Sequence, residues 1–281
     1  MEEKVRKLLE EDLGMGDVTT ALTIPATTTV EAEIIAKESG IVAGIEEVLT
    51  LLESLNLQTT ALVIDGSKID KRTTIMKIAG DARTLLSIER TLLNILSRMS
   101  GIATKTNRIV NKVRHVGYKC RIACTRKVAP GLSYFDKKAA MLGGADTHRL
   151  RLDDLVLIKD NHLAVTRDIR RTVEEVRNTV SFSKKIEIEV STKSDALEAA
   201  EAGVDIIMLD NFSPQEIKET IALLRKKELQ ESVLIEASGG INEENILEFA
   251  DTGVDIISLG EITDSVEALD TSLEIVKVLK E

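Results

Sequence analysis

The chain has 281 residues, a length that allows one large barrel-type domain or two smaller domains. Its 37 Lys and Arg residues against 47 Asp and Glu residues give a formal net charge of −10. This charge argues against a nucleic-acid-binding protein, because such a surface neutralises phosphates with basic side chains. Hydrophobic residues make up 43% and aromatic residues only 2%, so we expect a folded protein with an aliphatic core and few platforms for stacked bases.

The sequence also carries signals of cellular location. No apolar run approaches the ~20 residues that span a bilayer, and residues 1–14 predict a charged amphipathic helix without the apolar core of a signal peptide. Cys120 and Cys124 lie in one predicted strand, where a rise of ~3.3 Å per residue separates their Cα atoms by roughly 13 Å, too far for a disulfide. Two unpaired thiols suit a reducing compartment, so we expect a cytoplasmic protein.

The first hundred residues predict strands and long helices without strict alternation. In chain order we expect a strand at Thr28–Ala36, a helix at Ile45–Leu55, strands at Ala61–Ile64 and Thr74–Ala79, and a long amphipathic helix at Ala82–Met99. This order indicates a separate α/β layer, and we place its boundary near Gly101.

The rest of the chain alternates short apolar segments with amphipathic ones. The expected strands are Cys120–Cys124, Leu155–Ile158, Ile186–Val190, Asp205–Leu209, Val233–Ala237 and Asp255–Leu259. The expected helices are Ser194–Ala202, Pro214–Arg225 and Asn242–Ala250, each with a Ser or Asn near its start. Regular alternation with short loops predicts a parallel sheet.

An internal near-repeat supports this interpretation. The sequence AGVDII at residues 202–207 recurs as TGVDII at residues 252–257, an offset of 50 residues that suits two strand–helix units. The glycine of each copy, Gly203 or Gly253, would end one helix before the next strand. Beyond the last strand we expect a final helix, Ser265–Lys280, that packs back onto the N-terminal layer.

Polar residues follow each predicted strand of the parallel sheet. They are Thr125-Arg126-Lys127, Lys159-Asp160-Asn161-His162, Glu189, Asp210-Asn211, Ser238-Gly239-Gly240 and Gly260-Glu261. In parallel barrels the carboxyl ends of the strands build the active site. Arg and Lys bind carboxylates and phosphates, two acids can hold hydrated Mg²⁺, and a Ser-Gly-Gly turn offers backbone N–H groups to phosphate. The set favours a phosphate-bearing ligand with Mg²⁺ over a purely structural barrel.

The basic residues are concentrated in one segment. Between Lys112 and Arg151 there are ten basic and two acidic residues, so this segment carries +8 and the rest of the chain −18. A local reversal of this size is typical of a site for small, highly charged anions. Within it, His148 and Arg149 follow a polar, Gly-rich loop, and we expect His148 to contact a ligand. His162 has two open roles, ligand contact or helix cap.

At this point the sequence resembles a known family. The segment TRKVAPGLSYFDKKAAMLGGADTHRLRLDDLVLIKDNHL, Thr125–Leu163, resembles the signature region of quinolinate phosphoribosyltransferase, also called carboxylating nicotinate-nucleotide pyrophosphorylase. Further similar segments are Leu13–Thr19, Glu89–Thr104, Ala202–Asn211 and Glu236–Ile246. The resemblance implies an N-terminal α/β sandwich domain at 1–103 and an incomplete parallel α/β barrel at 104–264, a type II phosphoribosyltransferase-like fold.

The resemblance also implies a reaction and its residues. The family transfers phosphoribose from 5-phosphoribosyl-1-pyrophosphate to quinolinate and releases pyrophosphate and CO₂, giving nicotinate mononucleotide for NAD synthesis. The resemblance assigns quinolinate to Arg90, Arg126, Lys127, His148, Arg149 and Lys159. It assigns the phosphoribosyl donor to Lys127, Lys159, Glu189, Asp210, Ser238, Gly239, Gly240 and Gly260. Lys127, Lys159, Glu189 and Asp210 are the expected catalytic residues, and Glu189 and Asp210 would hold Mg²⁺, directly or through water.

The resemblance has further consequences for assembly and specificity. Arg90 matches an arginine that the family donates from a neighbouring subunit, which implies a homodimer or a larger homo-oligomer such as a hexamer. Val128 and Ala129 stand where the family commonly has two hydroxyl residues, so fine substrate contacts differ here. The alternatives are a related phosphoribosyltransferase for nicotinate or another aromatic acid, including homologues associated with molybdate transport, and a non-catalytic barrel that binds a phosphorylated ligand.

Overall fold

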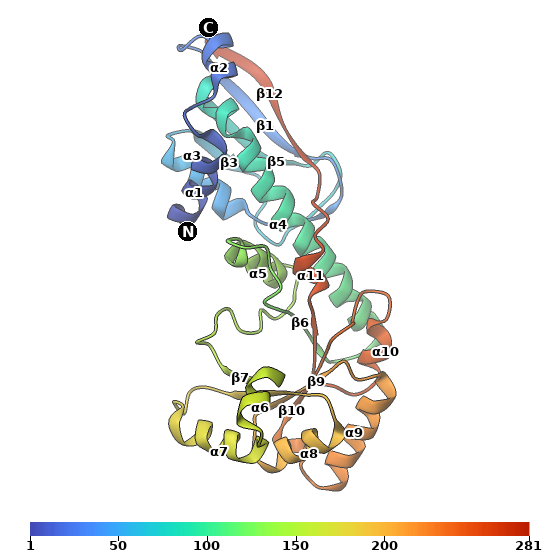
Figure 1. Ribbon diagram of the computed structural model, residues 1–281. Coiled ribbons are helices and arrows are strands. Elements are labelled where there is room, and N and C mark those ends of the chain that lie inside the picture. Colours follow the sequence, from blue (N-terminus) through green and yellow to red (C-terminus); the bar gives the residue numbers. More distant parts are fainter. Residues whose placement is uncertain (281) are drawn as a thin grey trace. The chain divides into compact units, whose positions relative to one another are not determined.

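The computed structural model describes residues 1–280, and these form two compact units (Figure 1). The first contains Met1–Asn107, Tyr134–Gly143 and the described chain from Val266 onward. The second contains Arg108–Ser133 and Gly144–Ser265. In residues 1–280 no helix is both long enough and apolar enough to cross a membrane.

An antiparallel sheet forms the centre of the first unit. Its strands run in the order β12 (Thr271–Lys280), β1 (Thr29–Ala36), β5 (Thr74–Asp81) and β3 (Gln58–Ala61). A small separate ladder joins β2 (Gly40–Ile41) to β4 (Lys68–Ile69). The helices of this unit are α1 (Glu2–Leu13), α2 (Val18–Thr23), α3 (Ile45–Ser54), the first part of α4 (Ala82–Val116) and α5 (Ser133–Leu142). Every second residue of β1 is buried, as expected for a strand that packs one face against a core.

The predicted C-terminal helix is wrong. Residues 271–280 form strand β12, which pairs antiparallel with β1 along its whole length. The segment does return to the N-terminal layer, but as an edge strand. Ile275, Val276 and Val278 are β-branched and favour a strand, and the free edge of β1 offers the unpaired N–H and C=O groups that a helix would leave unused.

Three other boundaries differ from the sequence prediction. The strand expected at Ala61–Ile64 lies earlier, at Gln58–Ala61, because pairing with β5 sets its register. The long helix continues past Met99 to Val116, so the units divide between Asn107 and Arg108 and not near residue 103. Gly101 lies inside this helix, where a Cβ would meet the Glu267 carbonyl oxygen at 2.0 Å. The glycine permits close packing of two chain segments and marks no boundary. Residues 134–143, expected in the barrel domain, belong to the first unit.

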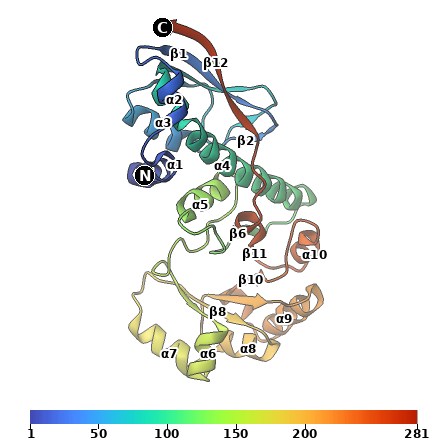
Figure 2. The ribbon, with the colours of Figure 1, turned by 45° about the horizontal axis from the view of Figure 1, so that its top comes forward.

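A parallel sheet of six strands forms the second unit (Figure 2). The order is β6 (Arg121–Cys124), β11 (Ile256–Leu259), β10 (Leu234–Ser238), β9 (Ile206–Asp210), β8 (Ile186–Val190) and β7 (Val156–Ile158). The helices of this unit are α6 (Asp160–Thr166), α7 (Ile169–Thr179), α8 (Lys193–Glu201), α9 (Pro214–Lys226), the short α10 (Ile246–Ala250) and α11 (Glu261–Asp264). Gln230–Ser232 forms one 3₁₀ turn, η1. The predicted parallel α/β sheet is confirmed, with each strand within one residue of its expected ends.

The barrel formed by this sheet is incomplete. β6 and β7 lie at opposite ends of the strand order and do not pair in the described chain. A single parallel bridge joins Ala123 of β6 to Asp146, so the loop after α5 takes the place of one strand. The predicted incomplete barrel therefore opens between this loop and β7.

The internal repeat has a structural purpose. Asp205 accepts a hydrogen bond from the Ile186 backbone N–H at 2.7 Å, and Asp255 accepts one from the Ile235 N–H at 2.8 Å. Each repeated aspartate thus satisfies a backbone donor at the start of the neighbouring strand.

The predicted helix starts agree less well with the structure: Ser213 caps α9 as expected, whereas Thr192 caps α8 and α10 begins only after Asn245. Neither Cys120 nor Cys124 forms a disulfide, as predicted.

A buried ion pair links two helices of the first unit. Arg98 of α4 donates to both carboxylate oxygens of Asp136 of α5, at 2.8 and 2.9 Å, and the Asp136 side chain is fully buried. We expect Arg98→Met to lower the free energy of unfolding by about 3 kcal/mol, because a buried carboxylate loses its bidentate cation. Urea denaturation followed by circular dichroism measures this change.

The matched control is Arg171→Met. Arg171 pairs with Glu175 one helical turn away, and both side chains are more than 60% exposed. This variant should lose less than about 1 kcal/mol. Equal losses in the two variants would contradict a special contribution of the buried pair.

Candidate active site

A pocket of about 800 Å³ opens at the carboxyl ends of the parallel strands. Side chains alternate between the two faces of a strand, so residues two apart share the inner face. The inner face of β8 therefore carries Glu187 and Glu189, and that of β10 carries Glu236 and Ser238. The structure brings all the predicted site residues except Arg90 into this one lining. They are Arg126, Lys127, His148, Arg149, Lys159, Glu189, Asp210, Ser238, Gly239, Gly240 and Gly260.

Two acids and one lysine stand on neighbouring strands of the pocket. Lys159, at the end of β7, forms an ion pair with Glu189 at the end of β8. Asp210 ends β9, and its carboxylate accepts a hydrogen bond from the Asn211 side-chain amide at 2.7 Å. Mg²⁺ prefers one or two carboxylates together with water and substrate phosphates. Glu189 and Asp210 therefore have the right chemistry for Mg²⁺ beside an anionic ligand.

The Ser238-Gly239-Gly240 turn needs its glycines. Gly239 has φ +91° and Gly240 has φ +65°, conformations that favour glycine. A Cβ on Gly239 would meet Asn211 Oδ1 at 2.4 Å and the Asn211 backbone nitrogen at 2.8 Å, whereas one on Gly240 would meet nothing within 4 Å. The first glycine thus permits the turns after β9 and β10 to touch.

Three cationic side chains face the pocket from the basic segment. Arg126 and Lys127 are exposed and follow β6, and the Lys127 carbonyl accepts a hydrogen bond from Thr263 Oγ1 at 2.7 Å. Arg149 is only 7% exposed. Burial lowers the pKa of its guanidinium, and the nearby charge of Arg126 lowers it further. Like charges held this close favour an anion between them.

His148 is held by two buried carboxylates that sequence reasoning missed. Its Nε2 lies 3.2 Å from Glu187 Oε2 and 3.2 Å from Glu236 Oε2, and both carboxylates are fully buried. Burial lowers the pKa of the imidazole, whereas the carboxylates of Glu187 and Glu236 favour a proton on the ring and raise its pKa. Burial also raises the pKa of Glu187. The signal was the alternation itself, which puts Glu187 on the same face as Glu189.

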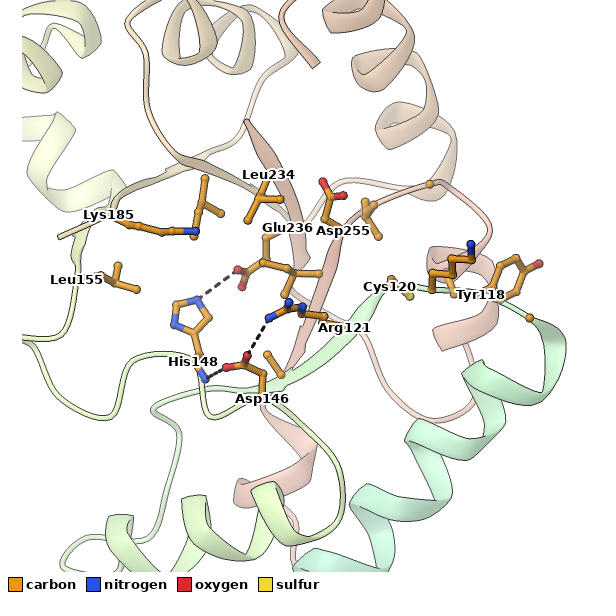
Figure 3. Close-up of a pocket in the computed structure, with 18 residues that line it drawn as sticks. Tyr118, Cys120, Arg121, Asp146, His148, Leu155, Lys185, Leu234, Glu236 and Asp255 are labelled. Atoms are coloured by element: carbon orange, nitrogen blue, oxygen red, sulfur yellow. Dashed lines mark hydrogen bonds and ion pairs between the residues drawn. The ribbon is translucent and has the colours of Figure 1, made fainter. Parts of the chain in front are cut away.

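A second cavity, of about 730 Å³, lies toward the starts of the strands (Figure 3). His148 and Glu236 line both cavities, so they separate the two ends of the barrel interior. In the second cavity Arg121 pairs with Asp146 at 3.7 Å. His162 lies outside both linings, where its Nδ1 accepts the Lys159 backbone N–H at 2.9 Å, so it caps α6.

Arg90 belongs to the first unit. It is exposed on α4 and lines neither cavity of the second unit. Its predicted role depends on a second subunit and stays a prediction.

Comparisons with known proteins give the family. Residues 17–100 match the N-terminal domain of quinolinate phosphoribosyl transferase, and residues 102–274 match its C-terminal domain. The chain belongs to the quinolinate phosphoribosyltransferase family. It is 46% identical to a probable carboxylating nicotinate-nucleotide pyrophosphorylase of Methanocaldococcus jannaschii over 97% of this chain and 96% of the relative. It is 37% identical to the human carboxylating nicotinate-nucleotide pyrophosphorylase over 87% of this chain and 82% of the relative.

Solved structures agree with this family. The nicotinate-nucleotide pyrophosphorylase of Francisella tularensis superposes with a TM-score of 0.90 at 34% identity, covering 98% of this chain and 97% of that one. The NadC structure from Streptococcus pyogenes has the same TM-score at 31% identity, covering 99% and 96%. The predicted fold, with an N-terminal α/β domain and an incomplete α/β barrel, is therefore confirmed.

The glycine turn gives a test of anion binding. We expect Gly239→Ala to weaken binding of 5-phosphoribosyl-1-pyrophosphate by about tenfold or more, because the added Cβ separates the two turns that line the pocket. Isothermal titration calorimetry with 5-phosphoribosyl-1-pyrophosphate and Mg²⁺ measures the affinity. Gly240→Ala is the control: it has similar backbone strain and open space, and its loss should be several times smaller. Equal losses would show that backbone strain alone, and not the close approach, matters.

Proposed function

We propose that this protein transfers phosphoribose from 5-phosphoribosyl-1-pyrophosphate to quinolinate, with loss of CO₂, and so makes nicotinate mononucleotide for NAD synthesis. Membership of the family supports the reaction. The observation that supports it on this chain is the pocket at the strand ends, which Arg126 and Arg149 line together with Glu189 and Asp210. Both substrates are small and highly anionic, which suits the basic segment between Lys112 and Arg151.

Quinolinate recognition falls to the cationic side of the pocket. Its two adjacent carboxylates form a planar dianion, which the fork of an arginine fixes by paired hydrogen bonds as a lysine alone would not. We assign this role to Arg126 and Arg149, with Lys127 and Lys159 between the two substrates. The burial of Arg149 strengthens its attraction for a carboxylate, because less water screens the charge.

We assign binding of the phosphoribosyl donor to the carboxyl ends of strands β8–β11. The backbone N–H groups of the Ser238–Gly240 turn and of Gly260 suit its 5′-phosphate. Glu189 and Asp210 suit the ribose hydroxyls and Mg²⁺. When bound there, Mg²⁺ would neutralise charge that grows on the departing pyrophosphate.

The chain supplies positioning and charge in the transfer step. The pyridine nitrogen attacks the anomeric carbon directly, so no protein nucleophile is required. As the bond to pyrophosphate breaks, positive charge grows on the ribose ring near Glu189 and Asp210, and negative charge grows near Lys127 and Lys159. The ring nitrogen, now cationic, stabilises the electron pair left on C2 when the 2-carboxylate leaves as CO₂, and C2 then takes a proton from water.

The main alternative is a phosphoribosyltransferase for nicotinate or another aromatic acid. A single carboxylate would use one arginine, so the pair Arg126 and Arg149 favours a dicarboxylate. Val128 and Ala129 stand where the family commonly has hydroxyl residues, and their effect on substrate preference belongs to the same assay.

The decisive assay follows nicotinate mononucleotide and CO₂ from quinolinate, 5-phosphoribosyl-1-pyrophosphate and Mg²⁺. We expect turnover of quinolinate and none of nicotinate, and loss of turnover on chelation of Mg²⁺. Lys159→Ala and Asp210→Ala should each lower kcat by about 100-fold or more, because each removes charge that opposes charge of the transition state. Turnover of nicotinate but not quinolinate would contradict the proposal, and unchanged rates in both variants would refute the site assignment.

We infer further that the active enzyme is a homo-oligomer with a shared site, in which Arg90 reaches the quinolinate pocket of a neighbouring subunit, and that it works in the cytoplasm. The exposed position of Arg90 on α4 leaves it accessible to a second chain. Two inactive variants test the idea, Arg90→Ala and Lys159→Ala.

Mixing the two variants under conditions of subunit exchange should restore activity. In a dimer one of the two sites of each mixed pair carries neither substitution, so about a quarter of wild-type activity is expected from random exchange. Arg83→Ala is the control, since Arg83 donates to backbone carbonyls within its own unit at 2.7 and 3.2 Å and should not lose activity. If mixtures shown to exchange subunits do not regain activity, Arg90 acts in the site of its own subunit or has no role in the reaction.

A further inference from the structure

We propose that Glu187 and Glu236 are positioning residues: together they hold the His148 ring, and with it the turn that aims Arg149 into the anion pocket. This inference rests on the proposed function, since it assigns the two buried carboxylates to quinolinate recognition. It also changes the expected role of His148 from a direct ligand contact to a support for its neighbour.

Both nitrogens of the His148 ring are already engaged inside the protein. Nδ1 lies 2.8 Å from the Arg149 backbone nitrogen and accepts its N–H. Because Nδ1 accepts this N–H, the ring proton is on Nε2, which lies 3.2 Å from Glu187 Oε2 and 3.2 Å from Glu236 Oε2. Figure 3 shows the contact with Glu236. Nε2 therefore donates to Glu236, with the Glu187 carboxylate also 3.2 Å away, and no ring nitrogen is left to bind a substrate carboxylate.

The same hydrogen bonds argue against a metal ion between His148, Glu187 and Glu236. The three side chains offer ligand atoms within 4.8 Å of one another, which is close enough for a metal site. A metal-bound histidine uses the lone pair of one nitrogen and donates its other N–H to an acceptor. Here the other nitrogen faces a donor, the Arg149 N–H, so the lone pair at Nε2 is not available.

The backbone at His148 needs this support. Its φ of +51° is unusual for a residue with a side chain and persists only where the surroundings fix it. Asp146 Oδ1 accepts the His148 backbone N–H at 2.8 Å, and Asp146 itself bridges to β6 (Figure 3). The strand bridge fixes one side of the turn and the carboxylate pair fixes the ring. The next residue, Arg149, is thereby directed into the pocket lining.

The barrel does not need acids at these positions for packing. Met208 of β9, which lies between β8 and β10 and pairs in register with Glu236, fills the same interior with an apolar side chain. Both carboxylate oxygens of Glu187 and Oε1 of Glu236 are buried and have no hydrogen-bond partner. Such atoms cost stability. Two acids retained at this cost, both directed at one ring, point to a functional use.

The experiment separates positioning from folding and from catalysis. Glu236→Leu removes an acceptor for Nε2, and Glu236→Gln keeps an acceptor oxygen. We expect Glu236→Leu to raise the KM for quinolinate by about tenfold, with the KM for 5-phosphoribosyl-1-pyrophosphate within about twofold, and Glu236→Gln to restore most of the loss. Glu187→Leu and Glu187→Gln should behave in the same way.

Glu47→Leu is the matched control. Glu47 is also a fully buried carboxylate, but it lies in the first unit and its contacts, Tyr134 and Lys138, do not line the pocket. Its loss should lower Tm and leave both KM values unchanged. If the Glu236 variants likewise lose Tm with both KM values unchanged, the pair is only structural and the proposal is overturned.

Two further measurements keep the proposal testable apart from the reaction. ¹⁵N NMR of the full-length wild-type protein should show His148 protonated at Nε2 and unprotonated at Nδ1, and a proton on Nδ1, in the reverse tautomer or in the imidazolium, would overturn the proposal. Metal analysis of the same protein should give no stoichiometric ion lost in Glu187→Gln, and finding one would assign a metal site instead. If wild type makes no nicotinate mononucleotide, the proposed function fails, yet the tautomer still reports on the carboxylate pair.

Discussion

The candidate site depends on one constraint, the alternation of side chains along six parallel strands. Residues two apart along a strand both point inward, so every strand places one side chain at the rim of the barrel and another in the layer below. On β8 these are Glu189 and Glu187, and on β10 they are Ser238 and Glu236. The rim thus holds groups that can meet a ligand, and the layer below holds groups that can only support them.

The ionisable side chains inside the barrel lie in two local clusters. Lys159 pairs with Glu189 at the rim, and His148 lies between Glu187 and Glu236 below it. An interior of low polarity makes each unpaired charge costly. Arg126 and Lys127 are exposed at the mouth, and the buried Arg149 lines the same pocket, where an arriving anion can reach all three. The net charge of −10 for the whole chain therefore conceals a sharp separation of opposite charges.

The sequence was informative where the pattern is local and repeated. Short apolar strands between capped helices fixed the parallel sheet, and the repeated Asp205 and Asp255 hold neighbouring strands in the same way. The sequence-based prediction failed where pairing with a strand far away in the chain determines the secondary structure. Residues 271–280 have enough apolar spacing to suit a helix, but the open edge of β1 makes them a strand, and that edge is more than two hundred residues away in the chain.

The same division explains which site residues sequence reasoning found. Residues that follow a strand, such as Lys159 and Asp210, stand out because a polar group after an apolar run suits a strand end. Glu187 and Glu236 stand inside apolar runs, where a polar residue reads as an exposed alternate position. Only the closing of the sheet toward His148 turns both inward onto one ring. Residues that touch a ligand can therefore be predicted from motif position, whereas those that hold them depend on how strands far apart in the chain curve around a common interior.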